Sequence, residues 1–409
     1  MRRFFVLSIV FLSCVEPSTY EAPDNAWHIG ALLPYTGINS SGAENVEQAI
    51  LLAIEQTNAL GGVAERPLWL VSRNTQSNTS LGLAEARALI ENDGVVAILG
   101  PEDSGLVRIL RSILKSKGVL QLSADVTAAP TTVIDDGGMV FQVVPSIGTL
   151  GASLASLLRE AQPKKTVVFY VNDDYGIRFR DALWCALGEL PAIAFGEEEA
   201  SLAEAVAAFP VDADAAVLIG YPRSSAALIQ RLSARTSTPI RWFLAPSLRN
   251  PRLLANLPAG ALESALGLAP TLSDADRRAF ESLFTQRWGA LPSYASPFYY
   301  DAAVLLALAM ASANAAGASP LNGAAISEHL HRVASPPGSK VAWSQLGQAM
   351  ELIRAGEDID YVGVTGDVDL DESGETSSGL LDRFEVQGGS FVTKGTQESV
   401  SLETCLYLP

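Results

Sequence analysis

The chain has 409 residues and a formal net charge of −17, and 48% of its residues are hydrophobic. An ordinary domain holds about 100–200 residues, so this length predicts two domains, each with its own core. The chain has 45 acidic and only 28 basic side chains. This balance argues against nucleic acid as a partner, because phosphate backbones are held by clustered Lys and Arg. With three cysteines and three histidines, we expect no thiolate or histidine-rich metal centre and no cofactor.

Residues 1–14 have the pattern of an export signal. Two arginines precede a mostly apolar run, 4–12, which is too short to cross a bilayer core of ~30 Å as a resident helix. Ser13 and Cys14 follow, and this pair resembles the lipobox of bacterial lipoproteins, in which the cysteine is lipidated and becomes the new N-terminus. An ordinary secretory signal is the alternative. We expect a lipid-anchored protein of the periplasm or cell envelope.

The segment 15–26 is rich in Pro, Glu, Ser and Asn, and it reads as a tether between the lipid and the folded part. We therefore expect contact with the membrane only through the lipid on Cys14. Export also permits a disulfide between the two remaining cysteines, Cys185 and Cys405. Two buried thiols remain the alternative, because sequence gives no distance between them.

From residue 28 onward, short apolar runs typical of strands alternate with segments of helical periodicity. The first series predicts strands at 29–33, 68–71, 95–99, 119–122 and 139–144, and the second, after Pro163, predicts strands at 166–171, 192–195, 215–219 and 240–244. Such alternation indicates parallel sheets with helices on both faces. After Pro270 we expect four helices, at 274–288, 301–315, 326–333 and 346–355, with too few strands for a third sheet.

Common catalytic signatures are missing from the sequence. There is no G-x-S-x-G, no H-E-x-x-H and no Gly-Lys pair of a phosphate loop. Ser112 to Lys115 has the S-x-x-K spacing but falls within a helical pattern. The acidic run at Asp367 begins like a calcium loop, yet Glu372 stands where that loop needs glycine, so a turn through 371–374 is the better interpretation. We expect a protein that is not an enzyme.

Two loops that follow predicted strands carry polar groups suited to a small ligand. Ser104 lies at the start of a helix, where unpaired N–H groups and partial positive charge favour a carboxylate. At the end of the next strand, Thr127 offers a donor and the Val126 carbonyl offers an acceptor for an ammonium group. The alternative for Ser104 is a plain helix cap. Because ligands of open α/β sheets lie at the carboxyl ends of strands, the two loops indicate one crevice.

Several motifs, in this order and spacing, make the chain similar to the type I periplasmic binding proteins. The resemblance is to the leucine/isoleucine/valine-binding family of solute receptors for ATP-binding-cassette (ABC) importers. The motifs lie at Ile29–Gly37, Asn58–Gly62, Arg66–Leu68, Gly100–Ser104, Leu122–Thr127, Asn172–Gly176, Tyr300–Ala302, Tyr361–Gly366 and Asp371–Gly374.

The resemblance implies an α/β fold of two doubly wound parallel-sheet lobes joined by a three-crossover hinge. The first lobe would comprise 27–147 and 270–366, and the second would comprise 148–269 and 367–409. It also implies a small-molecule ligand and an ABC transporter permease as partners.

By the same resemblance, Ser104, Val126 and Thr127 match the positions that hold the ligand's carboxylate and amine. Tyr175 and Tyr221 match aromatic residues of the facing lobe. These five residues are the predicted ligand-binding residues.

Two departures concern the ligand's amine. Amino-acid receptors of this family carry acids where this chain has Ile147 and Ser247. An unpaired ammonium in a closed cleft would cost several kcal/mol. Unless Glu102, Asp103 or Asp125 compensates, branched-chain amino acids should bind weakly and ligands that lack the amine should bind better. Asp103, Asp125 and Ser247 are thus further candidate site residues.

The sequence therefore predicts an exported solute-binding protein that captures a small polar, amino-acid-like or carboxylate-bearing ligand for an ABC importer. The alternative is an envelope lipoprotein of the same fold that regulates a protein partner, such as a cell-wall synthase.

Overall fold

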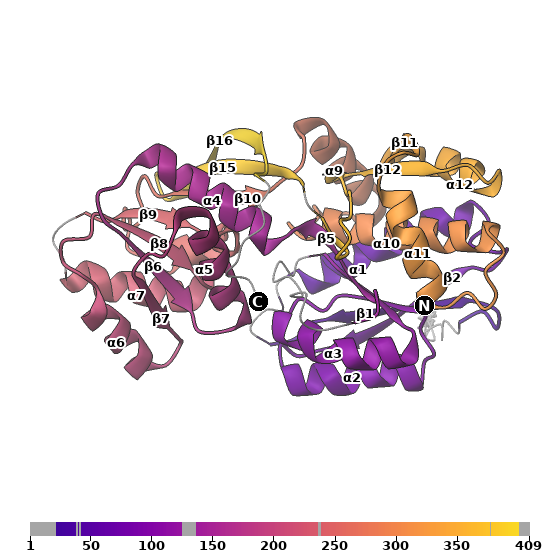
Figure 1. The fold of residues 1–409 in the computed structure, drawn as a ribbon, viewed down its shortest axis with the longest axis horizontal. Helices are drawn as coiled ribbons and strands as arrows, with labels where there is room; N and C mark the ends of the chain where they lie inside the picture. The colour runs from indigo at the N-terminus through magenta and orange to yellow at the C-terminus, as the bar shows by residue number, and fades with distance from the viewer. Residues whose placement is uncertain are drawn as a thin grey trace, which may run out of the picture.

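The computed structural model describes residues 22–400 except 38–39, 41, 125–135, 236–238 and 377. The chain forms two α/β lobes that lie side by side (Figure 1). The first lobe combines the indigo and purple N-terminal part with the orange helices near the end of the chain. The second lobe combines the magenta and pink middle of the chain with a yellow C-terminal hairpin.

A six-stranded sheet forms the centre of the first lobe, in the order β14-β5-β4-β3-β1-β2, and all its neighbouring strands are parallel. Its strands are β1 Trp27–Leu33, β2 Leu68–Asn74, β3 Ala97–Leu99, β4 Leu120–Ser123, β5 Val140–Pro145 and β14 Glu375–Thr376. Helices α1 Ala43–Ala59, α2 Thr79–Glu91 and α3 Ser104–Lys117 connect them. Every residue of β3, β4 and β5 is buried, as expected for strands covered on both faces.

Four later helices return to this lobe, as the sequence predicted. They are α9 Asp274–Trp288, α10 Ser296–Ala315, α11 Gly323–Ala334 and α12 Leu346–Arg354. Helix α10 packs against α1 and α11. In the described part of the chain, α10 alone is long and apolar enough to cross a membrane, but most of it is buried inside the protein. It is therefore the core helix of the first lobe.

A small third sheet lies beside these helices, so the prediction that the late segment lacks one is wrong. It contains β11 Ser339–Ala342, β12 Ile359–Gly363 and β13 Gly366–Asp367. These strands have only four, five and two residues. Runs this short carry too little periodicity to stand out from the surrounding helical pattern.

The second lobe has a seven-stranded sheet in the order β16-β15-β10-β9-β8-β6-β7. Five of its strands are parallel to one another: β6 Thr166–Val171, β7 Ala192–Phe195, β8 Ala215–Ile219, β9 Arg241–Leu244 and β10 Leu266–Pro270. An antiparallel hairpin extends the sheet at β10, and it consists of β15 Leu380–Gln387 and β16 Ser390–Glu398. The helices are α4 Ile147–Ala161, α5 Asp174–Leu187, α6 Glu199–Ala208, α7 Pro222–Arg235 and α8 Pro251–Ala255, and two 3₁₀ turns lie at Pro246–Leu248 and, in the first lobe, Trp343–Gln345.

Three crossovers join the lobes, between β5 and α4, between β10 and α9, and between β14 and β15. The lobe bounds implied by the family resemblance put the last crossover after Gly366. Strand β14 instead pairs with β5 in the first lobe, with Glu375 beside Gln142, so the chain leaves this lobe only after Thr376. The predicted turn is present, since the Gly374 N–H donates to the Asp371 carbonyl at 2.9 Å.

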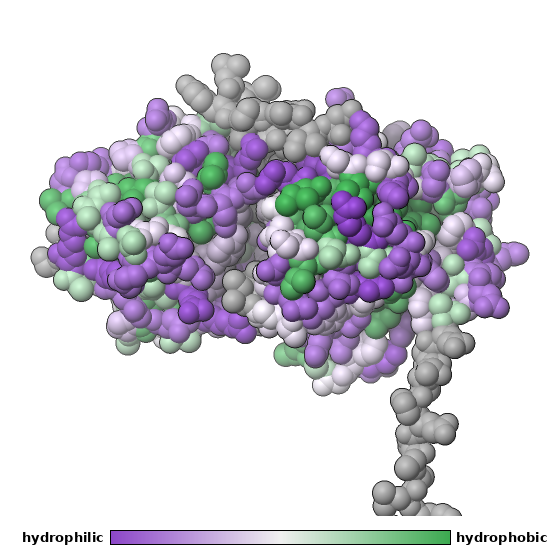
Figure 2. Space-filling view, turned by 90° about the horizontal axis from the view of Figure 1, so that it is seen from below, coloured by the Kyte–Doolittle hydropathy of each residue, from purple (hydrophilic) through white to green (hydrophobic). Residues whose placement is uncertain are grey.

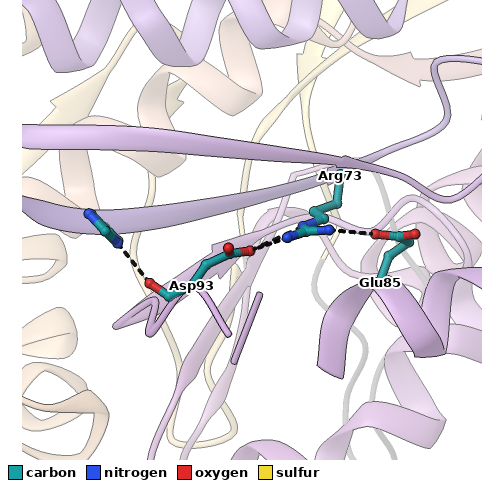
Figure 3. Close-up of polar contacts among 4 residues, drawn as sticks. Arg73, Glu85 and Asp93 are labelled. Atoms are coloured by element: carbon teal, nitrogen blue, oxygen red, sulfur yellow. Dashed lines mark hydrogen bonds and ion pairs between the residues drawn. The ribbon is translucent and has the colours of Figure 1, made fainter. Parts of the chain in front are cut away.

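Strand β2 forms an edge of the first sheet, and an ion-pair network ties it to the following segment (Figure 3). The Arg73 guanidinium lies 2.7 Å from the Asp93 carboxylate and 3.3 Å from that of Glu85. The carbonyl of Asp93 also meets the Nδ1 of His28 on β1 at 2.7 Å. These contacts fix the loop between α2 and β3.

The outer face of the first lobe that carries α2 and α3 is mostly hydrophilic, with some apolar side chains gathered on it (Figure 2). Leu81 of α2 and Ile109 of α3 are among the exposed large apolar residues. On the rest of the visible surface, hydrophilic residues predominate and apolar residues are scattered among them.

Candidate ligand-binding cleft

A cavity of about 160 Å³ lies between the two lobes, next to the hinge. It is smaller than the ~300–1,000 Å³ usual for ligand pockets, so it suits a small solute. The first lobe contributes Glu102, Ser104, Ala124, Val144, Tyr294, Ala295 and Phe298, and the second contributes Tyr175, Tyr221, Pro246, Ser247 and Pro270.

On the first lobe, the loop from β3 to α3 brings two polar residues to the cavity, Glu102 and Ser104. The loop turns at Gly100, whose φ of +93° and close approach to the Leu32 carbonyl leave no room for a side chain. Asp103 caps α3, since its Oδ1 accepts from the Leu106 N–H at 2.5 Å. Ser104 is therefore the first helical residue rather than the cap.

On the second lobe, Tyr175 and Ser247 are linked by a directed hydrogen bond. Ser247 Oγ donates its single proton to the Gly220 carbonyl at 2.7 Å. The Tyr175 hydroxyl, 2.9 Å away, must then be the donor to Ser247. Burial raises the pKa of Tyr175, so this phenol stays neutral.

Tyr221 stacks on Tyr175, with ring centroids 5.8 Å apart and ring planes 28° apart. Its side chain is 38% exposed and lines the cavity. The hydroxyl of Tyr221 hydrogen-bonds to Asp173, which caps α5 by accepting from the Gly176 N–H at 2.9 Å. Burial, followed by the charge of Asp173, raises the pKa of Tyr221. Two neutral aromatic rings thus form the wall of the second lobe.

Tyr294 and Phe298, at the start of α10, complete the cavity next to the hinge. Their ring centroids lie 5.8 Å apart, and the Tyr294 hydroxyl donates to the Pro270 carbonyl at 2.8 Å. Neither residue was predicted from the sequence, because the helix expected at 301–315 begins after both of them. Glu102 was predicted only as one of three acids, with Asp103 and Asp125, that could hold a ligand amine.

The structure brings together four of the predicted site residues, namely Ser104, Tyr175, Tyr221 and Ser247. The Asp103 side chain caps α3 by accepting from the Leu106 N–H. Ile147 lies in the core at the start of α4 and is 2% exposed. Asp125, Val126 and Thr127 lie outside the described residues, as do Cys14 and Cys405. Ligand contact stays a prediction for every candidate binding residue, and so does lipidation of Cys14.

Cys185 on α5 is disulfide-bonded. Its predicted partner lies outside the described residues, so the pairing with Cys405 stays a prediction. Within the described ranges, no three His, Cys, Asp or Glu side chains are grouped so that they could hold a metal ion.

A model of the periplasmic binding protein family matches residues 26–357. The chain belongs to this family. Its solved relatives include the leucine-binding protein LivK of Thermotoga maritima, with a TM-score of 0.72 and 19% identity over 91% of this chain and 98% of the other. Another is a solute-binding protein of an ABC transporter from R. palustris in complex with benzoate, with a TM-score of 0.65 and 17% identity over 92% and 98% of the two chains.

A curated relative of this periplasmic binding protein is the chemotactic signal transduction system substrate-binding protein BasB of Halobacterium salinarum. The two are 27% identical over 371 residues, which is 86% of this chain and 85% of BasB. The fold is that of the type I periplasmic binding proteins, as predicted. Proteins of this family are extracytoplasmic substrate-binding proteins of ABC transporters, and as a family they are not enzymes.

Proposed function

We propose that this chain captures a small solute, amino-acid-like or carboxylate-bearing, and delivers it to the permease of an ABC importer. The observation that carries the proposal is the cavity at the hinge, which receives polar and aromatic side chains from both lobes. A ligand that contacts both walls stabilises the closed arrangement of the lobes. Closure is the signal that a permease can recognise.

Within the cavity, the Ser104 hydroxyl at the start of α3, next to the Asp103 cap, can donate to a ligand carboxylate. Tyr175 and Tyr221 offer ring faces and hydroxyl groups from the opposite wall. The relatives support ligands of this kind, because one is described as a leucine-binding protein and another was solved with benzoate.

A receptor role is the second candidate. BasB is described as a substrate-binding protein of a chemotactic signal transduction system. A loaded binding protein of this fold can therefore signal to a membrane partner instead of feeding an importer. Deletion of the protein separates the two roles, because only the importer role predicts loss of ligand uptake.

The test of solute binding is thermal unfolding of the purified, ligand-stripped protein against a metabolite library. A ligand present at a hundred times its Kd should stabilise the fold by about 2.7 kcal/mol. Ser104→Trp, which places a large ring in the cavity, should abolish the stabilisation. No stabilisation by any solute, together with co-purification of a cell-wall synthase, would overturn the proposal in favour of a regulatory lipoprotein.

We also propose that the mature protein is anchored to the membrane through a lipid on Cys14. Cys14→Ser should leave the precursor unacylated and move the protein to a different cell fraction. A wild-type mature protein that begins beyond Cys14 and fractionates as freely soluble would contradict this.

A further inference from the structure

We propose that a small oxyanion of the phosphate or sulfate type binds in a second cavity, which lies at the hinge beside the candidate cleft. This cavity has a volume of about 100 Å³ and shares the wall residue Tyr294 with the cleft. A single water needs only about 10–15 Å³, so there is room for an ion of this size. The site goes beyond the proposed function, because its two arginines, Arg249 and Arg277, do not line the cavity assigned to the solute.

The first observation is an arginine that lacks a carboxylate partner. Arg277 on α9 lines the cavity, and its Nη2 donates to Thr271 Oγ1 at 2.9 Å and to the Leu272 carbonyl at 3.3 Å. Both acceptors are neutral, and both residues lie in the crossover between β10 and α9. Within the described ranges, Arg277 forms no ion pair, and its Nε and Nη1 have no hydrogen-bond acceptor. An unpaired guanidinium in a cavity favours an anion, and its planar fork of donors suits a phosphate.

The second observation is a guanidinium that reaches the same cavity from the other lobe. Arg249 of the second lobe lines the cavity. Its Nη2 pairs with Asp382 and donates to Thr393 Oγ1 at 3.2 Å, which leaves Nε and Nη1 without an acceptor in the part of the chain that the structure describes. Burial raises the pKa of Tyr294, and the charge of Arg249 is the strongest influence against this shift, so the positive charge lies close to the cavity wall. An oxyanion held by both arginines would join the two lobes at the hinge.

A third donor belongs to the crossover itself. Thr271 is 3% exposed, and its hydroxyl oxygen accepts from Arg277. The hydroxyl proton has no acceptor among the described residues, so it can be donated to a ligand oxygen. The donors thus come from α9, from the crossover and from the second lobe. A tetrahedral oxyanion presents oxygens in several directions, and it suits this arrangement better than a carboxylate, whose two oxygens lie on one side.

Among the described residues that line the cavity, one is an acid, Glu281, which lies one turn of α9 after Arg277. The two side chains form no ion pair with each other in the described structure, so the acid does not neutralise Arg277. The negative charge of Glu281 would repel a bound anion and lower the affinity of the site. Removing that charge should therefore strengthen binding, whereas removing the charge of Arg277 should weaken it.

The test is calorimetric titration of the purified mature chain with sodium phosphate and sodium sulfate, and with acetate and chloride as comparison anions, all at matched ionic strength. The proteins are the wild type, Arg277→Gln, Glu281→Gln and a control, Arg278→Gln. Arg278 neighbours Arg277 on α9 but does not line the cavity, so the control removes the same charge from the same helix. Arg249 is left unchanged, because its removal would leave the buried Asp382 carboxylate unpaired. Thermal unfolding verifies that each variant is folded.

We expect phosphate and sulfate to bind at least roughly ten-fold more tightly than acetate or chloride. Arg277→Gln should weaken their binding by roughly ten-fold or more, because a charge-assisted hydrogen bond is lost. Glu281→Gln should strengthen it by about two- to five-fold, and Arg278→Gln should change it by less than about two-fold.

The inference is overturned if neither phosphate nor sulfate binds with a Kd below about 10 mM, or if acetate or chloride binds as tightly as they do. It is also overturned if Arg277→Gln and Arg278→Gln lower the affinity equally. If Arg277→Gln does not fold, unchanged or weaker binding to Glu281→Gln overturns it. Loss of phosphate binding in Ser104→Trp, which fills the cleft, would place the ion in the solute cavity and would equally contradict the inference.

Discussion

Asp301 on α10 is a fully buried carboxylate that joins the core helix of the first lobe to the small third sheet. Its Oδ1 accepts from the Tyr361 hydroxyl at 2.8 Å and the Val364 N–H at 2.9 Å. Its Oδ2 accepts from the N–H and the hydroxyl of Thr365, at 2.9 and 2.7 Å. Burial raises the pKa of Asp301 to about 6, although these four hydrogen bonds oppose the shift.

Replacing this carboxylate should destabilise the protein strongly. Asp301→Ala leaves four buried donors without an acceptor, and we expect the free energy of unfolding to fall by about 3–5 kcal/mol. Urea denaturation of the purified variant measures the loss. Asp358→Ala is the control, because Asp358 forms an exposed pair with Arg332 and should cost at most about 1 kcal/mol. Equal losses in the two variants would contradict the structural role of Asp301.

Single residues of the cleft differ in how far sequence predicts them. Ser104 follows a strand end, where ligand sites of α/β sheets concentrate, and so its place in the cavity was predictable from its position. Tyr175 and Tyr221 were predicted only through the resemblance to the leucine/isoleucine/valine-binding family. The place of Tyr294 in the cavity was not predictable, because this residue lies between α9 and α10 and not at a strand end. Its position is set by the packing of α10 and not by any local pattern.

Strand β14 is short, but it carries a buried acid beside the third crossover. Glu375 is 9% exposed. Burial raises its pKa from 4.5 to about 8; the charge of Asp371 adds to the shift, while Arg111 and a hydrogen bond with Ser146 oppose it. Because the folded-state pKa is above the unfolded value, the stability that this group confers is complete below about pH 4.5 and is lost as the pH rises towards 8.

The variant Glu375→Gln should therefore become more stable relative to wild type as the pH rises. We expect a difference near zero at pH 4, growing to roughly a few kcal/mol in favour of the variant by pH 9. Urea denaturation of both proteins at several pH values measures this difference, in which the titration of all other groups largely cancels. A difference that stays constant with pH would show that Glu375 ionises normally in the fold.

Helix α5 carries Cys185, for which we predict a bond to Cys405 of the C-terminal segment. Alkylation of the denatured, unreduced mature protein should label neither cysteine, and digestion should yield one peptide pair that separates after reduction. A reduced sample treated in parallel should be labelled at both positions. Labelling at both positions without reduction would disprove the pairing.

Among the helices and strands, the sequence predicted the short apolar strands of the second lobe well, but it did not predict the glycine-containing helix α4. The strand bounds predicted at 166–171, 192–195 and 215–219 are those observed, because short apolar runs between turns are distinctive. Helix α4 was not predicted, since its glycines lower helix propensity. Gly151 of α4 is required by packing, because a Cβ there would lie 2.6 Å from the Cβ of Ala182 on α5. Such a constraint appears only once the two helices are placed together.

At the scale of the whole molecule, one ion pair joins α3 of the first lobe to α5 of the second. Arg108 Nε lies 2.8 Å from Asp174 Oδ2, and both side chains are about half exposed, at 51% and 41%. Exposed pairs of this kind contribute about 0–1 kcal/mol and are screened by salt. The pair should favour the closed arrangement of the lobes by a small, salt-dependent amount.

Removing Arg108 should therefore weaken ligand binding slightly without changing the fold. We expect Arg108→Ala to reduce affinity by less than about five-fold at low salt, and the difference from wild type to vanish near 1 M salt. Calorimetry with a ligand found by thermal unfolding measures both values. Arg287→Ala is the matched control, because its pair with Glu55, at 2.7 Å, lies within the first lobe. An equal loss of affinity in the control would show that the pair does not act between the lobes.

Native mass spectrometry of gently purified mature protein shows whether the cavity between the lobes holds a small solute. We expect a small-molecule adduct on the wild-type chain that is lost on unfolding and absent from Ser104→Trp. Retention of the same adduct by Ser104→Trp would place the solute elsewhere. A wild-type chain that carries no adduct, and gains none after incubation with any solute of the library, would contradict the claim.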